Sequence, residues 1–379
     1  MGVISYRAEA GALDAEILRV IERWSTPPGY RGHWEYSDPD FEFDFDDLAL
    51  RIFEHQLRFN EPYARYCASL GTTMREPANW REIPPIPAGA FKEAALCTFD
   101  ALQAGIVFET SGTTTGSGGT HYMEDARLYD ASLLAGFDYG VLRDASDPLR
   151  YCMLLASPEQ SPRSSLSYMM DRVAAEFGDG TETWYVDGGK IEAGRFVADI
   201  RKARKNDVPV CIAGTAFAFV SLLDELAQRQ MRITLPLPSG SRIMETGGFK
   251  GRTRAIERAD LYERLGDVFT LRPHHIIGEY GMTELSSQYY DDTYDVRRSK
   301  DSPPWLRSYA VDENGKKLPS GVVGALVHVD LANRSSCVAI QTEDLGAIVD
   351  GGIILIGREQ GAELRGCSLD AESLRAAIS

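Results

Sequence analysis

Between residues 105 and 285, short apolar runs alternate with segments of helical periodicity, and this rhythm restricts the chain to few folds. Residues 151–156 predict a buried strand, followed by a helix over Ser165–Phe177. Residues 208–213 predict the next strand, and residues 216–229 the next helix. Strands that alternate with helices in this way form a largely parallel sheet. The sequence therefore predicts an α/β fold.

The predicted strands end at turns that are rich in glycine and threonine, namely Gly214-Thr215, Gly247-Gly248 and Glu279-Tyr-Gly-Met-Thr-Glu284. The last two turns follow predicted strands over 243–246 and 275–278. A helix carrying Lys250 and Arg252 is expected between them, running to Leu265. Open α/β sheets bind ligands at the carboxyl ends of their strands. These turns are therefore candidate ligand-binding segments.

The regions on either side have other patterns. Residues 13–24 and 45–70 show helical spacing, and Pro84-Pro-Ile-Pro87 predicts an extended connector. Beyond residue 300 we predict short antiparallel strands over 325–329, 337–341, 346–349 and 353–356, separated by Asn333, Asp344, Gly351 and Gly352. We expect three regions: a helical part (1–100) packed on the core, an α/β core for nucleotide and acid (101–300), and a small β lobe with a short tail (301–379).

The segment Thr110-Ser-Gly-Thr-Thr-Thr-Gly-Ser-Gly-Gly-Thr-His121 consists almost entirely of glycines and hydroxyl side chains. Glycine lets backbone N–H groups approach a ligand closely, and Ser and Thr add hydroxyl donors, so this composition favours phosphate. The segment lacks the lysine that a Walker loop requires. A flexible surface loop is the alternative interpretation of the same composition.

The chain has 379 residues and a formal net charge of −16. This charge argues against binding to nucleic acid or to an anionic membrane surface, since both would be repelled. It does not exclude ATP, which helix N-termini, backbone N–H groups and a divalent metal can bind on an acidic protein.

The six cysteines are dispersed and show no zinc-site spacing. We see no signal peptide, no myristoylation pattern and no segment long enough to span a membrane. These features predict reduced thiols in a cytoplasmic protein.

Four motifs occur in a fixed order: the loop at 110–121, Tyr280-Gly-Met-Thr-Glu284, Thr342-Glu-Asp344 and Gly357-Arg358. Together they resemble the adenylate-forming enzymes, which include acyl-CoA synthetases, luciferases and the adenylation domains of peptide synthetases. The resemblance implies the large-domain fold of that superfamily. It also implies ATP and Mg²⁺ as cofactors.

Further segments resemble one branch, the LuxE-type acyl-protein synthetases that activate fatty acids for an acyl reductase. They are Leu48-Ala-Leu-Arg-Ile-Phe-Glu-His-Gln56, Asn60-Glu-Pro-Tyr-Ala-Arg-Tyr-Cys67, Ile86-Pro-Ala-Gly-Ala-Phe-Lys92, Thr246-Gly-Gly-Phe-Lys-Gly-Arg252 and Glu363-Leu-Arg-Gly-Cys-Ser368. This likeness extends over nearly the whole chain.

The resemblance implies particular roles. The loop would hold the β and γ phosphates, Thr283 would contact the α-phosphate, and Glu284 would bind Mg²⁺. Tyr280 would offer its ring to adenine, Asp344 would accept bonds from the ribose hydroxyls, and Arg358 would donate to the ribose or phosphate. The nucleotide-binding residues would be Ser111, Gly112, Thr113, Thr114, Thr115, Gly116, Gly247, Gly248, Tyr280, Gly281, Asp344 and Arg358.

Each of these residues also has a structural interpretation. Taken alone, Tyr280 is more often a core aromatic, Asp344 beside Leu345-Gly346 is compatible with a turn, and Glu284 with a solvated charge. The functional interpretation is favoured because the motifs coincide in the family's order.

The sequence departs from the superfamily at two places. The phosphate loop ends in Gly118-Gly119-Thr120-His121 without the usual basic residue, so His121 is either a partial substitute or an ordinary loop histidine. Only 21 residues follow Arg358, which is too short for the mobile C-terminal domain with its catalytic lysine. Lys250 is a candidate for neutralising phosphate charge, although a helix-surface lysine is the plainer assignment.

Cys367 lies where the resembling acyl-protein synthetases carry an acylated cysteine. Arg365 nearby would favour its thiolate, whereas a buried, inert cysteine is the alternative. The acid pocket is expected between residues 157–168 and 213–219, where Phe217, Phe219, Met169 and Met170 line a channel or belong to the core.

The sequence therefore predicts an ATP-dependent enzyme that converts a carboxylic acid, with fatty acids favoured, to acyl-AMP and transfers the acyl group to Cys367 or to a partner's thiol. One alternative is a ligase that uses the pantetheine thiol of CoA or an acyl carrier protein. A second alternative is a catalytically silent partner of an acyl reductase or carrier protein.

Overall fold

The computed structural model describes residues 2–25, 42–70, 77–110, 118–143, 145, 148–228, 234–247, 258–350 and 352–358. Its α-helices in these ranges are α1 (Gly2–Trp24), α2 (Phe45–Phe59), α3 (Glu61–Ser69), α4 (Arg127–Gly140), α5 (Ser165–Phe177), α6 (Ala193–Lys205), α7 (Ala216–Gln228) and α8 (Arg258–Phe269).

The first strands along the chain are β1 (Ile86–Pro87), β2 (Ile106–Glu109), β3 (Thr120–Met123), β4 (Arg150–Leu154), β5 (Thr183–Trp184), β6 (Val186–Asp187), β7 (Lys190–Ile191) and β8 (Val210–Thr215). They are followed by β9 (Arg242–Thr246), β10 (Ile276–Tyr280), β11 (Tyr289–Asp291), β12 (Lys300–Asp301), β13 (Leu306–Val311), β14 (Gly324–Asp330), β15 (Ala339–Val349) and β16 (Gly352–Arg358).

One large sheet connects both halves of the molecule, with the strand order β13-β14-β15-β16-β12-β11-β10-β9-β8-β4-β5. Strands β5, β4, β8, β9 and β10 pair in parallel. From β10 onward through β11, β12, β16, β15, β14 and β13, every neighbouring pair on this path is antiparallel. The change from parallel to antiparallel pairing therefore occurs at β10, which has a parallel neighbour on one side and an antiparallel neighbour on the other.

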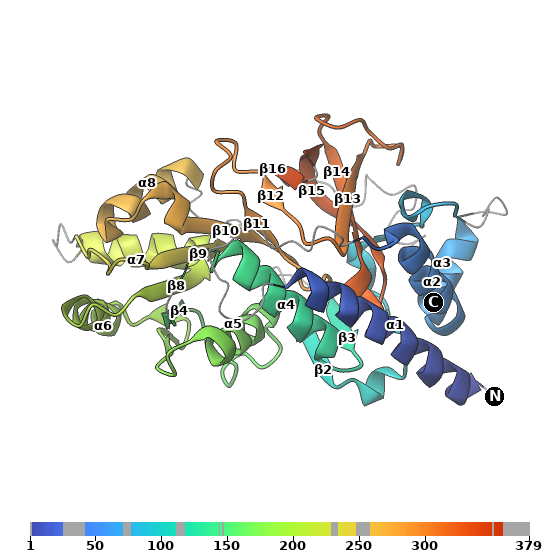
Figure 1. The fold of residues 1–379 in the computed structure, drawn as a ribbon, viewed down its shortest axis with the longest axis horizontal. Helices are drawn as coiled ribbons and strands as arrows, with labels where there is room; N and C mark the ends of the chain where they lie inside the picture. The colour runs from blue at the N-terminus through green and yellow to red at the C-terminus, as the bar shows by residue number, and fades with distance from the viewer. Residues whose placement is uncertain are drawn as a thin grey trace.

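Helices cover both faces of the parallel half (Figure 1). On one face, α6, α7 and α8 pack against Ile212 and Ile243. On the other face, α4 and α5 pack against Cys211, Ala213 and Met244, the residues that alternate with them along the same strands. This two-sided burial explains the nearly continuous apolar runs in the sequence.

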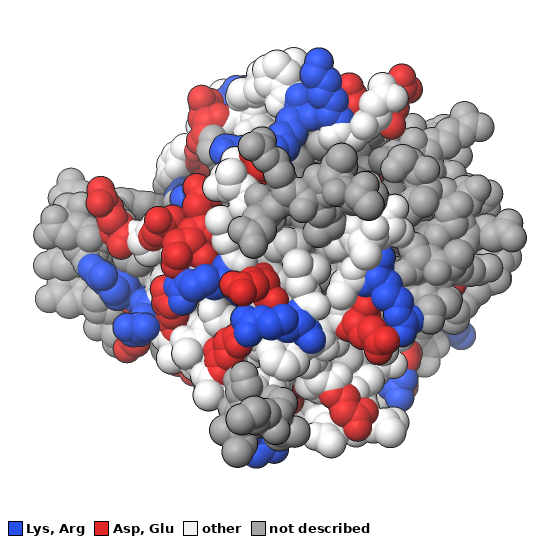
Figure 2. Space-filling model, turned by 90° about the vertical axis from the view of Figure 1, so that its right-hand side faces the viewer, with Lys and Arg blue, Asp and Glu red and all other residues white. Residues whose placement is uncertain are grey.

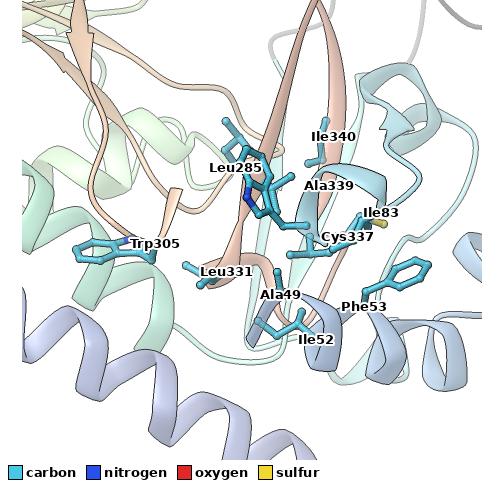
Figure 3. Packing of buried hydrophobic residues seen from close by; sticks show 14 of the residues in the cluster. Ala49, Ile52, Phe53, Ile83, Leu285, Trp305, Leu331, Cys337, Ala339 and Ile340 are labelled. Atoms are coloured by element: carbon cyan, nitrogen blue, oxygen red, sulfur yellow. The ribbon is translucent and has the colours of Figure 1, made fainter. Parts of the chain in front are cut away.

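Helices α2 and α3 pack against the antiparallel half, away from α6 to α8, whereas α1 runs along α4 (Figure 1). Figure 3 shows Ala49, Ile52 and Phe53 of α2 facing Leu331, Cys337, Ala339 and Ile340, which belong to β15 or to the segment between β14 and β15. Polar bonds add to this contact, since the buried Gln56 side chain donates to the backbone oxygens of Asn333 and Arg334 at 2.9 and 3.1 Å.

Most of the predicted elements are present, and α5 has the predicted bounds. The prediction of separate strands over 337–341 and 346–349 is wrong, because β15 is one strand over Ala339–Val349 and Asp344 lies inside it rather than in a turn. Met169, Met170 and Phe219 are core residues on the two faces of the sheet, in agreement with the second of the two interpretations of these side chains. Phe217 remains partly exposed. The boundaries of the three predicted regions stay predictions.

Figure 2 shows acidic and basic side chains interspersed on one face of the molecule. Among the residues described there, no extended basic area is visible of the kind that nucleic acids bind. Within the described ranges, no helix has the length and apolar character needed to cross a membrane.

Candidate active site

The motif at 280–284 lies at the carboxyl end of β10, where the sheet changes from parallel to antiparallel pairing. Tyr280 is the last residue of β10 and pairs with Tyr289 of β11. Residues 281–288 connect these two strands. The motif therefore lies at the edge of the sheet where ligands are expected to bind.

Buried hydrogen bonds hold this connection in place. The backbone N–H groups of Ser286 and Ser287 donate to Asp330 Oδ2 at 3.0 and 2.9 Å, and the Ser287 hydroxyl donates to Asp330 Oδ1 at 2.7 Å. Asn333 Nδ2 donates to the backbone oxygen of Glu284 at 2.9 Å. Asp330 and Asn333 thus fix the backbone that carries Glu284.

The glycine- and threonine-rich loop connects the two strands of a hairpin, β2 and β3. Its base is closed by the Gly119 N–H, which donates to Thr110 Oγ1 at 2.7 Å. Gly118 is required there, because a Cβ at this position would lie 2.3 Å from the Thr110 backbone oxygen. The predicted phosphate-binding residues Ser111 to Gly116 lie outside the described residues.

The base of this loop lies next to the predicted metal ligand. A Cβ built on Gly119 would be 3.6 Å from Glu284 Oε1, and Glu284 itself is buried. The His121 ring nitrogen Nδ1 lies 2.8 Å from the backbone oxygen of Thr283 and joins β3 to the motif. His121 and Thr283 are 162 positions apart in the sequence. The base of the loop and the motif at 280–284 therefore meet at this edge of the sheet.

His121 does not supply the missing positive charge of the phosphate loop. Its side chain is buried, and burial lowers the pKa of His121 to about 4, so the ring is neutral at physiological pH. Its Nδ1 bond to Thr283 gives it a structural role instead. The interpretation of His121 as an ordinary loop histidine needs one correction, because the residue is buried and belongs to strand β3.

Tyr280 and Asp344 lie in direct contact. The Tyr280 hydroxyl donates to Asp344 Oδ2 at 2.9 Å, although the two residues are 64 positions apart. Val327 pairs with Gln341 and Ala325 with Leu345, so residues 342–344 form a bulge opposite a single residue of β14. This bulge interrupts the ladder beside Tyr280 and accounts for the position of Asp344.

The remaining predicted residues are only partly described. Arg358 pairs with Asp344 across β15 and β16, which brings the two backbones together. Gly247 directly follows β9 with a φ of 75°, a left-handed conformation that favours glycine. A Cβ on Gly281 would come within 2.5 Å of Glu279 Oε1. Gly248, Lys250 and Cys367 lie outside the described residues, whereas the other five cysteines are buried.

Magnesium would find the buried carboxylate of Glu284 here, and Glu279 in β10 is a second buried carboxylate near the motif. The described residues contain no cluster of three or more His, Cys, Asp or Glu side chains that could hold a metal ion. Mg²⁺ commonly binds through one or two carboxylates together with substrate phosphates and water. Glu284 next to a phosphate-type loop is compatible with that mode of binding.

Sequence reasoning missed three buried polar residues around this site: His328, Asp330 and Asn333. His328 bridges Tyr280 and Tyr289, with its Nε2 3.1 Å from the Tyr280 hydroxyl. His328 and Asp330 lie in a strand of otherwise apolar residues, and the sequence has no local signal for their partners.

No family model matches this sequence, and no curated protein matches it. Among solved structures, the chain resembles a 2-hydroxyisobutyryl-CoA ligase in an open conformation, in complex with 2-HIB-AMP and CoA, with a TM-score of 0.63 and 13% identity. That alignment covers 89% of this chain and 80% of the ligase chain.

Other structural matches are weaker. The amide bond synthetase McbA from Marinactinospora thermotolerans matches with 16% identity, and ATP-bound MatB from Rhodopseudomonas palustris with 15%. Their TM-scores are 0.46 and 0.47, and the alignments cover 68% and 69% of this chain. This chain spans only 49% of the length of each.

At these identities the likeness concerns the fold alone. The match to the CoA ligase confirms the predicted fold class, an α/β large domain of the type found in adenylate-forming enzymes.

Proposed function

We propose that this protein activates a carboxylic acid with ATP, forms an acyl-AMP, and transfers the acyl group to a thiol. The observation that carries the proposal is the meeting of the predicted motifs at one sheet edge: Tyr280 bonds to Asp344, and Glu284 lies beside the base of the glycine-rich loop. The fold likeness to a CoA ligase is in agreement.

In the first step, a carboxylate oxygen of the acid attacks the α-phosphorus of ATP, and the bond to pyrophosphate breaks. The acid then carries AMP as a leaving group in place of an oxide ion. Bound at Glu284, Mg²⁺ would neutralise charge on the phosphates. The chain's own contribution is to hold the parts: the Tyr280 ring for adenine, Asp344 for ribose, and the loop base at Thr110 and Gly119 for the phosphate-binding segment.

In the second step, a thiolate attacks the acyl carbonyl carbon and AMP leaves, which produces a thioester. We propose Cys367 as this thiol and a fatty acid as the acid, on the resemblance to LuxE-type acyl-protein synthetases. A second candidate acceptor is the pantetheine thiol of CoA or of a carrier protein, which the fold likeness to a CoA ligase favours.

ATP–pyrophosphate exchange across a panel of fatty and aryl acids tests the first step. Exchange with at least one acid is expected. If no acid in the panel supports exchange, the adenylation proposal is wrong, and the silent-partner alternative is favoured.

Labelling with radioactive acid tests the acceptor. We expect the wild-type chain to become covalently labelled and Cys367→Ser to lose the label while retaining exchange. Unlabelled wild-type protein that transfers the acyl group to CoA would instead identify a CoA ligase.

A further inference from the structure

His328 lies in the interior of the antiparallel half, beneath the predicted nucleotide site. It belongs to β14 and pairs with Ser308 of β13 and Ile340 of β15. Its side chain is fully buried. The ring lies between two tyrosines, with centroid distances of 5.7 Å to Tyr280 and 5.3 Å to Tyr289.

Both ring nitrogens of His328 have hydrogen-bond partners. Nε2 is 3.1 Å from the Tyr280 hydroxyl. Nδ1 is 2.8 Å from the Tyr289 hydroxyl and 2.8 Å from the Ser308 hydroxyl. The histidine thus connects two hydroxyls of the core to Tyr280, the predicted adenine-binding residue.

The direction of these hydrogen bonds follows from Asp344, which bonds to the Tyr280 hydroxyl. The Asp344 carboxylate can only accept, so the Tyr280 hydroxyl donates its single proton to Asp344. The Tyr280 oxygen must then accept from the Nε2–H of His328. A neutral ring with its proton on Nε2 has an acceptor at Nδ1, which accepts from one of the Tyr289 and Ser308 hydroxyls, while these two hydroxyls also bond to each other.

Burial keeps His328 in this neutral form, because it lowers the pKa of the ring to about 4. The tautomer is therefore fixed by its partners at neutral pH.

We propose that His328 is a positioning residue for the nucleotide. By donating to the Tyr280 hydroxyl, it fixes the ring that faces adenine and directs the hydroxyl proton to Asp344, which orients that carboxylate for the ribose. The proposal rests on the proposed function, in which Tyr280 and Asp344 bind the nucleoside. A carboxylate has about four acceptor positions, so the bond from Tyr280 is compatible with ribose binding.

A purely structural role is the competing explanation, since the histidine also satisfies buried hydroxyls. The two roles predict different kinetic effects. A positioning role changes the apparent affinity for ATP and leaves the KM of the acid unchanged, whereas general loss of packing changes both or neither.

The main variants are His328→Leu, which removes both bonds, and His328→Gln, whose amide can donate to Tyr280 and accept from Ser308 or Tyr289. We expect His328→Leu to raise the KM and Kd for ATP about tenfold, which is the effect of losing one hydrogen bond in a buried site. His328→Gln should retain most of the wild-type affinity for ATP. The KM of the acid should stay within about twofold, because an acid bound elsewhere keeps its contacts.

The analogue 3′-deoxy-ATP gives a second readout. If His328 acts through Asp344, the preference of the enzyme for ATP over this analogue falls in His328→Leu. An unchanged preference, together with an unchanged Kd for ATP, would overturn the proposal.

His55 provides a matched control. It is also buried, its Nδ1 lies 3.0 Å from Glu9 Oε1, and its partner belongs to the N-terminal helices. His55→Leu is expected to lower stability without changing the Kd for ATP. Equal changes in Kd for His55→Leu and His328→Leu would show that loss of packing is the cause, and the proposal would be wrong.

Two further arms keep the test decisive. If His328→Leu does not fold, Tyr280→Phe is used instead, because it removes the other partner of the same bond. Tyr280→Phe should raise the Kd for ATP. Adding His328→Gln to Tyr280→Phe should not change this Kd further. Failure of the proposed function is recognised separately, because the wild-type protein itself would then not bind ATP. If the wild-type protein binds ATP and Tyr280→Phe binds it with the same Kd, the role of His328 is rejected and the proposed function is not.

Discussion

Strands β8 and β14 both lie inside the large sheet, yet they bury different kinds of side chain. Strand β8 buries Val210, Cys211, Ile212 and Ala213, all apolar or weakly polar. Strand β14 buries His328 and Asp330 among its apolar residues. Strand β8 is thus held by apolar area on two faces, and strand β14 also by specific hydrogen bonds.

This difference has a consequence for the candidate site. Apolar packing is roughly proportional to area and is not directional. Buried polar groups instead have a cost unless they find partners, so they select one arrangement of the chain. The residues that we propose to bind the nucleoside, Tyr280 and Asp344, are linked by such directional bonds to His328 of β14.

The largest expected effect is that of Asp330→Ala. It would leave buried donors of Ser286, Ser287 and Ala332 without their acceptor. We expect the free energy of unfolding to fall by about 4 kcal/mol, as for other breaks of a buried polar network. Urea unfolding measures it, and Asp330→Asn, which keeps an acceptor oxygen, should lose less. A loss below about 1 kcal/mol would abolish the distinction between strands β8 and β14.

The next effect concerns the connection between the halves, which carries Glu284. Glu284→Ala should lower ATP–pyrophosphate exchange about a hundredfold or more through loss of the magnesium ligand, with the fold retained. Glu343→Ala is the matched control, because Glu343 is an exposed carboxylate next to Asp344. A fully active Glu284→Ala variant would show that the metal assignment is wrong.

The same contrast explains how much the sequence predicts. Helix α5 was predictable because its apolar residues repeat at helical spacing. Strand β15 was predicted as two strands because the polar residues of its bulge, including Asp344, resemble a turn. The pairing of Tyr280 with Asp344 agrees with the motifs of the resembling family, although their nucleotide roles remain predictions.

The bonds that support the site were not predictable. His328 and its partner Tyr280 are 48 positions apart, and Asp330 and Ser287 are 43 apart. A single histidine in an apolar strand is compatible with many environments. Its partners are determined by the register of strands that the sequence pattern does not specify.

A smaller effect is expected from pH. Burial lowers the pKa of both His121 and His328 from 6.5 to about 4. Between these pH values the unfolded chain therefore binds more protons than the folded one. The stabilising contribution of the two neutral histidines is fully present above pH 6.5 and is lost as the pH falls toward 4. For each histidine, the free energy of unfolding should fall by about 2 kcal/mol between pH 7.5 and pH 5.

His328→Gln isolates one of these contributions. Between pH 7.5 and pH 5, the free energy of unfolding of this variant should fall by about 2 kcal/mol less than that of the wild-type protein. Urea unfolding at the two pH values measures this difference. Burial raises the pKa of Asp330 to about 6, which acts in the opposite direction, but this group is present in both proteins and cancels in the comparison. Identical pH dependence in the two proteins would contradict the buried neutral state of His328.

The smallest effect is expected in the parallel half. Ile212 of β8 is fully buried between α6 to α8 and the sheet, and Ile212→Val removes one methylene without creating an unpaired polar atom. We expect a loss of about 1 kcal/mol in the free energy of unfolding. Because no titrating group is affected, this loss should be the same at pH 7.5 and pH 5, in contrast to that of His328→Gln. A loss that changes with pH would mean that the packing of β8 also depends on a buried polar network.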